Sequence, residues 1–171
     1  MTKKLTFLIC LSSIAVALDQ LTKLYVHMNF QLHEVKMVFE NFFNITYVRN
    51  YGAAFGFLAH TPESFRQVFF LMMPPLACGI IIWILSTVKD TQAWQIVALS
   101  AIFGGALGNY IDRLHYGYVV DFLDFHFYQK QSWPAFNLAD SFIVSGVLYL
   151  IFLILTEKET STSNGQFVDK L

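Results

Sequence analysis

The stretch VFFLMMPPLACGIIIWILSTV, from Val68 to Val88, contains 21 consecutive uncharged residues. An α-helix rises about 1.5 Å per residue, so a helix of this length covers about 30 Å, the hydrocarbon thickness of a bilayer. Two similar uncharged stretches follow, from Ala93 to Ile111 and from Ser141 to Thr156. Each predicts a helix that spans a membrane.

The N-terminal segment permits two interpretations. Lys3 and Lys4, followed by an apolar run from Leu5 to Ile14, are typical of a cleavable signal peptide. The largely apolar pattern continues to Val26, however, which is long enough for a helix to cross the bilayer. We interpret it as a retained first span, which gives four predicted spans at about 5–27, 62–88, 93–113 and 138–156.

The composition supports a membrane protein and excludes other classes. Hydrophobic residues make up 56% of the chain and charged residues 13%, against about 45–50% and about 25% in soluble domains. The formal net charge is −1 and no basic run occurs, which argues against a nucleic-acid partner. Cys10 and Cys78 lie in apolar stretches without metal-ligand spacing, so we predict no metal and no cofactor.

The lengths of the connections predict how the chain crosses the membrane. Long connections run from about 28 to 60 and from about 113 to 136, whereas spans two and three are joined by a few residues. An even number of spans places both termini on the short-loop side, and Lys3 and Lys4 favour the cytoplasm for that side. We predict a single membrane domain over 1–160 and a polar, disordered cytoplasmic tail over 161–171.

Polar residues gather at one end of the predicted helices. Because consecutive spans run in opposite directions, residues late in spans one and three and early in span four lie at the same membrane face, together with both long connections. Charged groups in or beside a span are costly and therefore mark functional sites. The residues at this face are Asp19, Lys23, Asn50, Asn109, Asp112, Arg113, Asp121, Asp124, Asn137 and Asp140.

Structural roles remain open for some of these residues. Asp19 and Lys23 are four residues apart on a helix, so they can simply neutralise each other. Asn137 and Asp140 can cap the fourth helix by accepting hydrogen bonds from its free N–H groups. A transporter that uses the intramembrane charges as a proton or ion pathway is the alternative function.

Five segments carry these residues in a recognisable order. They resemble the motifs of the lipoprotein signal peptidase family, signal peptidase II, and the resemblance covers nearly all of the chain except the tail. The segments are DQLTK (19–23), NYGAAFG (50–56), GGALGNYIDR (104–113), VVDF (119–122) and FNLAD (136–140).

The resemblance implies an aspartic protease of the bacterial inner membrane that works without a cofactor near the outer face. Its partners would be diacylglyceryl-modified prolipoproteins, cleaved before the lipidated cysteine, and membrane phospholipid; we expect a monomer. Asp121 and Asp140 match the catalytic pair, with Asp124 as the alternative to Asp121. Supporting positions match Asp19, Lys23, Asn50, Gly52, Asn109, Asp112, Arg113 and Asn137.

The family resemblance also extends the predicted fold class. We expect an all-α membrane protein of four transmembrane helices, with a small extracytoplasmic β-sheet and a short helix in the first long connection. The strand-like residues from Asn44 to Val48 suit that sheet, and the segment from Phe57 to Phe65 suits that helix.

Two aspartates suit peptide hydrolysis because two nearby carboxylates resist ionising together and share one proton. The ionised carboxylate removes a proton from water as the water attacks the scissile carbonyl. The protonated carboxylate hydrogen-bonds the carbonyl oxygen and later helps to protonate the leaving amine. Which aspartate carries the proton stays open from the residues alone.

Overall fold

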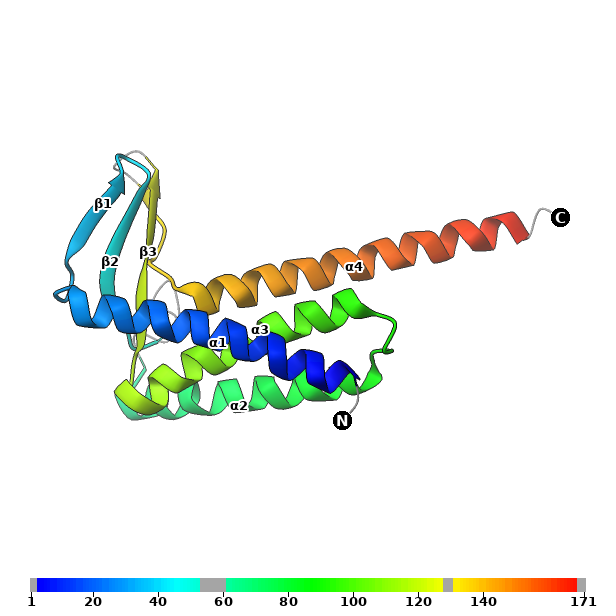
Figure 1. Cartoon of the computed structure of the whole chain (residues 1–171), viewed down its shortest axis with the longest axis horizontal. Helices are drawn as coiled ribbons and strands as arrows, with labels where there is room; N and C mark the ends of the chain where they lie inside the picture. The colour runs from blue at the N-terminus through cyan, green and yellow to red at the C-terminus, as the bar shows by residue number, and fades with distance from the viewer. Residues whose placement is uncertain (1–2, 53–60, 128–130, 169–171) are drawn as a thin grey trace.

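The computed structural model describes residues 3–52, 61–127 and 131–168. Four helices lie side by side over much of their length, and a small sheet lies at one end of them (Figure 1). The helices are α1 (Lys3–Asn29), α2 (Glu63–Thr87), α3 (Ala93–Tyr116) and α4 (Leu138–Val168). The strands are β1 (Val35–Phe39), β2 (Phe43–Asn50), β3 (Val119–Phe127) and β4 (Gln131–Ser132).

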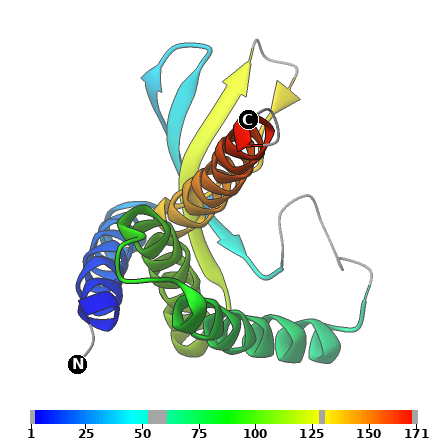
Figure 2. The same cartoon turned by 90° about the vertical axis from the view of Figure 1, so that its right-hand side faces the viewer.

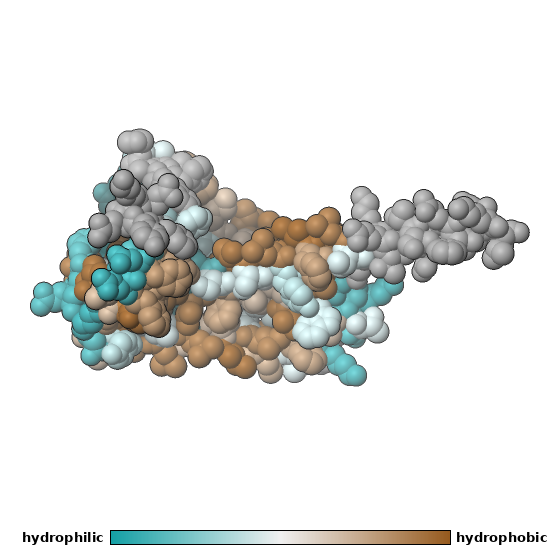
Figure 3. Space-filling view, turned by 90° about the horizontal axis from the view of Figure 1, so that it is seen from above, coloured by the Kyte–Doolittle hydropathy of each residue, from teal (hydrophilic) through white to brown (hydrophobic). Residues whose placement is uncertain are grey.

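All four helices contain a segment that is long and apolar enough to cross a membrane; in α4 this segment is Leu138–Thr156. Large apolar side chains point outward from them, and Trp83 and Leu148 are 67% and 61% exposed. Hydrophobic residues cover the middle of the helices, while hydrophilic residues gather at the two ends (Figure 3). Such a surface is stable in lipid, and it confirms the prediction of four spanning helices.

Helix α3 is the centre of the bundle, in contact with each of the other three helices (Figure 2). Two glycines allow its close approach to α4 and α1. A Cβ added at Gly105 would collide with the Ala139 carbonyl oxygen, and one at Gly108 would lie 2.5 Å from Asp19 Oδ2. The start of α4 and the polar part of α1 therefore both lie against the C-terminal half of α3.

Strands β1, β2 and β3 form an antiparallel sheet in that order, and the two-residue β4 pairs with the end of β3. One face packs on the end of α1, where Val26 and Phe30 meet Tyr47, Val120 and Phe122. Burial of these apolar side chains holds the sheet on the end of the bundle.

The sheet differs from the prediction in its origin. We expected all strands of the sheet to come from the first long connection. Strands β3 and β4 instead come from the second long connection, and β3 supplies the long antiparallel partner on the inner edge of β2. The first four residues of the expected short helix over 57–65 lie outside the described residues. The described part of that segment begins α2 at Glu63.

Helix α4 continues beyond its apolar segment to Val168. The sequence predicted disorder from 161 onward, whereas 161–168 are helical here and 169–171 lie outside the described residues. A helix that has already formed extends at little cost per added residue, and no proline follows Pro134 to end it.

Candidate active site

The polar residues predicted to share one face converge where the helical bundle meets the sheet. Asp121 lies within β3 and is 2% exposed, while Asp140 lies in the first turn of α4 and is half-buried. Both carboxyl groups line one cavity with a volume of about 610 Å³. Its other lining residues are Asn50, Gly52, Arg113, Trp133, Pro134, Ala135, Phe136, Ser141, Val144, Ser145 and Leu148.

Three asparagine amides donate hydrogen bonds to the two carboxyl groups. Asn50 Nδ2 lies 2.9 Å from Asp121 Oδ2, and Asn137 Nδ2 lies 2.7 Å from Asp121 Oδ1. Asn109 Nδ2 lies 2.7 Å from Asp140 Oδ1. The donors come from β2, α3 and the start of α4, so the relative positions of three elements fix the orientation of the pair.

Asn137 also caps helix α4. Its Oδ1 accepts the Asp140 backbone N–H at 2.9 Å, and Asp140 Oδ2 accepts the Asn137 backbone N–H at 3.3 Å. This reciprocal arrangement is a capping box, which satisfies N–H groups that a helix start leaves free. The capping interpretation of FNLAD is therefore confirmed, and the same Asn137 side chain additionally reaches Asp121.

The environment of Asp121 changes its acidity. Burial of this carboxyl group and the nearby charge of Asp140 raise its pKa to about 7, although the amide donors Asn50 and Asn137 lower it. Both causes of the increase disfavour the charged form. Asp121 can therefore carry a proton at a pH at which an ordinary aspartate is ionised.

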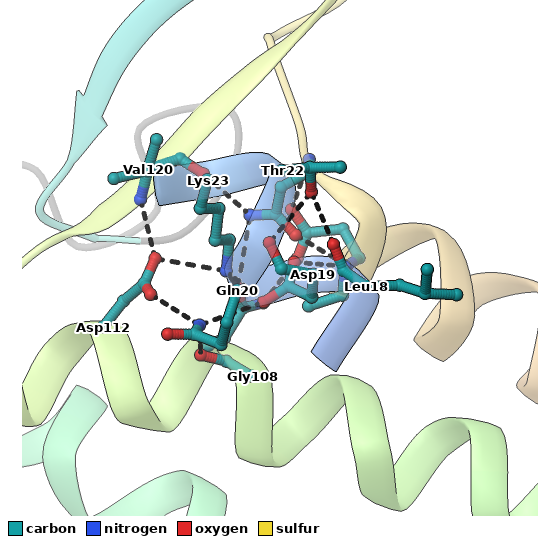
Figure 4. A network of polar contacts seen from close by, with 12 residues as sticks. Leu18, Asp19, Gln20, Thr22, Lys23, Gly108, Asp112 and Val120 are labelled. Atoms are coloured by element: carbon teal, nitrogen blue, oxygen red, sulfur yellow. Dashed lines mark hydrogen bonds and ion pairs between the residues drawn. The ribbon is translucent and has the colours of Figure 1, made fainter. Parts of the chain in front are cut away.

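A buried ion cluster lies between α1 and α3 (Figure 4). Lys23 Nζ lies 2.8 Å from Asp19 Oδ2 and 3.1 Å from Asp112 Oδ2, and all three side chains are at most 3% exposed. The predicted pairing of Asp19 with Lys23 is thus present, but it is only one part of the cluster. Lys23 Nζ also donates to Asn109 Oδ1 at 2.9 Å.

The two carboxylates of this cluster accept hydrogen bonds from the backbone of α4 and β3, the elements that carry Asp140 and Asp121. Asp19 Oδ1 accepts the Ala139 backbone N–H at 2.9 Å, in the first turn of α4. Asp112 Oδ2 accepts the Val120 backbone N–H at 3.0 Å, next to Asp121 in β3 (Figure 4). The cluster therefore joins α1 and α3 to the residues adjacent to both candidate aspartates.

Arg113 follows Asp112 but points into the cavity, as expected for neighbouring residues on a helix. Its guanidinium carbon lies 5.4 Å from the centre of the Phe70 ring, and its Nη2 lies 3.5 Å from the Gly52 carbonyl oxygen. Among the described residues that line this cavity, Arg113 is the one cation. It is therefore placed to interact with a carbonyl or carboxylate there.

Asp124 lies three residues after Asp121 but outside the cavity lining. Its Oδ2 accepts a hydrogen bond from Asn44 Nδ2 at 3.0 Å and lies 4.0 Å from His126 Nδ1. These contacts lie on the sheet, so the geometry favours Asp121 over Asp124 as the partner of Asp140.

Gln20 was not among the supporting residues predicted from the sequence. Its Nε2 lies 2.8 Å from Asp112 Oδ1, 3.2 Å from Asp19 Oδ2 and 3.0 Å from the Gly108 carbonyl oxygen (Figure 4). Its position between Asp19 and Lys23 in DQLTK was the available signal. Over the described ranges, no three His, Cys, Asp or Glu side chains are grouped as metal ligands would be.

The fold and the site together define a class: a multi-pass membrane protein with a paired-aspartate site of the kind that aspartic proteases use. Comparison with known proteins narrows the class. Residues 11–156 match the family model of signal peptidase (SPase) II. The chain therefore belongs to the signal peptidase II family, and it is a hydrolase that removes signal peptides from lipoprotein precursors.

Relatives and solved structures agree with this assignment. The chain is 43% identical to a lipoprotein signal peptidase of Syntrophus aciditrophicus over 94% of this chain and 100% of that protein. It is 45% identical to a lipoprotein signal peptidase of Syntrophotalea carbinolica over 84% and 88%. A bacterial membrane enzyme solved by the in meso method at 2.3 Å resolution shares the fold, with a TM-score of 0.77, 33% identity and 90% coverage of each chain.

Proposed function

We propose that Asp121 and Asp140 are the catalytic pair and cleave diacylglyceryl-modified prolipoproteins before the lipidated cysteine. The observation that carries the proposal is that both carboxyl groups line one cavity at the end of the bundle, each oriented by amide donors. The family fixes the reaction as signal-peptide removal, and these two aspartates have the chemistry that a proteolytic site without a nucleophilic side chain requires.

The two aspartates differ in ways that assign their roles. Asp121 is almost fully buried with a pKa of about 7, so it holds the shared proton at neutral pH and below. Asp140 is half-buried in the first turn of α4, where the helix dipole stabilises a negative charge. Asp140 takes a proton from a water molecule, and the oxygen of that water molecule attacks the scissile carbonyl carbon. Asp121 donates a hydrogen bond to the carbonyl oxygen, and the proton now on Asp140 passes to the leaving amine.

The shape of the cavity suits a substrate anchored in lipid. Its polar end holds the two aspartates and Arg113, and its other wall continues along one face of α4 through Val144 and Leu148. Each buried CH₂ contributes about 0.8 kcal/mol to membrane binding, so two acyl chains hold a lipidated cysteine firmly at the bilayer. The scissile bond then lies near the membrane surface, beside the carboxyl groups.

Activity is expected to depend on pH through Asp121. Below about pH 7 Asp121 is protonated and donates to the carbonyl oxygen, and above about pH 7 it is ionised and has no proton to donate. The rate of cleavage of a diacylglyceryl-modified precursor by purified protein in detergent should therefore fall as pH rises through about 7. A rate that stays constant from pH 6 to pH 9 would contradict this assignment of the proton.

We propose that the sheet and the cavity lie at the outer face of the inner membrane and that both termini are cytoplasmic. The start of α1 and the end of α4 lie at the end of the bundle opposite the sheet (Figure 1), and Lys3 and Lys4 lie there too. One chain supplies both carboxyl groups and all three amides, which supports a monomer in phospholipid. Fusions of alkaline phosphatase, which is active only outside the cytoplasm, should be active after Met37 and inactive after Lys170.

A further inference from the structure

Lys23 makes contacts that charge neutralisation alone does not require. Its ammonium group has three hydrogens and three acceptors: Asp19 Oδ2 at 2.8 Å, Asp112 Oδ2 at 3.1 Å and Asn109 Oδ1 at 2.9 Å. Two of these acceptors are charged carboxylates, but the third is the neutral amide oxygen of Asn109 on α3. The Lys23 side chain is 3% exposed, so water does not compete for this donor.

Two donors determine which end of the Asn109 amide faces Asp140: Lys23 Nζ lies 2.9 Å from Asn109 Oδ1, and Asn137 Nδ2 lies 3.2 Å from the same oxygen. A carboxamide has an oxygen that accepts and a nitrogen that donates, and the two ends have nearly the same shape. A lysine ammonium can only donate, so the Asn109 oxygen must face Lys23. The Asn109 NH₂ group then faces Asp140 Oδ1, at 2.7 Å.

The other two amides at the pair are oriented in the same manner, but by the backbone. Asn50 Oδ1 accepts the Gly52 backbone N–H at 2.9 Å, and Asn137 Oδ1 accepts the Asp140 backbone N–H at 2.9 Å. Each of these donors also lacks an acceptor function, so each amide must present its NH₂ group to a carboxyl group. Asn109 is the one of the three amides whose orientation depends on a side chain.

We infer that Lys23 is a positioning residue of the peptidase, which holds the Asn109 carboxamide so that its NH₂ group donates to Asp140. This inference rests on the proposed function, because it gives Lys23 a role only if Asp140 takes part in the reaction. If Lys23 were replaced by a side chain without a donor, the Asn109 oxygen would keep only the longer hydrogen bond from Asn137 Nδ2, and the amide could turn this oxygen toward Asp140. An oxygen there repels a carboxylate and removes the hydrogen bond that stabilises the ionised form.

The competing explanation is that Lys23 only neutralises Asp19 and Asp112, and the test must separate the two roles. The charged groups near the pair lie on α1, α3, β3 and α4, so a change of net charge would itself alter the pH dependence. These groups are Asp19, Lys23, Asp112, Arg113, Asp121 and Asp140.

The double variant Lys23→Met/Asp112→Asn removes one positive and one negative charge, so the net charge near the pair is unchanged. Wild type is therefore the charge-matched reference for the double variant. The single variant Asp112→Asn keeps Lys23 and its contact with Asn109, and it measures the effect of changing Asp112 alone. A hydrogen bond to a charged group is worth about ten- to hundredfold in an equilibrium or rate. We expect the double variant to lose about ten- to hundredfold in kcat relative to wild type, with KM for the lipidated precursor unchanged, and Asp112→Asn to lose less.

A double variant with the wild-type kcat, or one no more impaired than Asp112→Asn, would overturn the inference. Lys23→Arg is the second test if the double variant does not accumulate as a folded protein: it keeps a charged donor, so it should retain the wild-type pH profile. A folded Lys23→Arg protein as inactive as Asp140→Asn would also overturn it. If Asp140→Asn is itself active, the proposed function fails first, which distinguishes the two failures.

Discussion

Asp121→Asn and Asp140→Asn are each expected to abolish cleavage of a diacylglyceryl-modified precursor, with a loss in kcat of roughly 10³-fold or more. Each substitution leaves the shape of the side chain unchanged but removes a group that exchanges a proton, and positioned acid–base groups typically contribute about 10²–10⁴-fold. An amide at 121 or 140 also abolishes the shared proton on which the mechanism depends. Release of the signal peptide from purified, lipidated precursor, followed by gel mobility, measures this loss.

Asp124→Asn is the matched control for this pair of variants. Asp124 lies in β3, the strand that carries Asp121. Its carboxyl group accepts a hydrogen bond from Asn44 on the sheet and does not line the cavity. We expect its kcat to stay within about threefold of wild type, as for substitutions away from a reacting group. All three variants should insert and unfold at similar temperatures, since none changes side-chain volume. Full activity of Asp121→Asn combined with inactive Asp124→Asn would reverse the assignment.

The sequence was sufficient to predict that these residues meet, because alternating spans impose it. Three uncharged stretches and the largely apolar first span determine the direction of each helix, and the direction determines which end of α3 carries Asn109 and which end of α4 carries Asp140. The common end of the bundle follows without any tertiary contact. The same logic failed for the sheet, because strand pairing between β2 and β3 joins residues about 70 positions apart, such as Asn50 and Val119.

The individual roles of the polar residues could not be predicted for a related reason. Spacing along α1 suggested that Lys23 pairs with Asp19, and it does. The ammonium group of Lys23 also donates a hydrogen bond to Asn109, which is 86 positions away in the sequence. Residue spacing along one helix cannot predict such a contact. The role of Gln20 was not predicted for the same reason, because its partners Gly108 and Asp112 lie on another helix.

Asn137 is the residue whose two roles are hardest to separate, and its substitutions have the second largest expected effect. Its oxygen caps α4 through the Asp140 N–H, and its NH₂ group donates to Asp121 Oδ1 at 2.7 Å. It is fully buried, so either group left without a partner is costly. Asn137→Asp separates the roles, since a carboxylate still accepts the Asp140 N–H and is among the best helix caps.

Asn137→Asp should therefore fold with α4 intact but lose about 10²–10³-fold in kcat. The new carboxylate removes the donor to Asp121 and adds a third negative charge beside Asp121 and Asp140. Both changes disfavour ionisation, so the pKa of Asp121 rises further and the fall in rate moves above pH 7. A pH profile of kcat for the folded variant measures both effects.

Asn137→Ala supplies the comparison that assigns the loss to the donor or to the cap. It removes both groups, so it should cost about 1 kcal/mol in helix capping and more for the unsatisfied partners, which a lower unfolding temperature in detergent would report. Asn137→Asp keeps the cap but loses the donor, so its unfolding temperature should fall by less than that of Asn137→Ala, and it should still be inactive at pH 7. If Asn137→Asp is as active as wild type and only Asn137→Ala is impaired, then Asn137 serves α4 as a cap and contributes nothing to the state of Asp121.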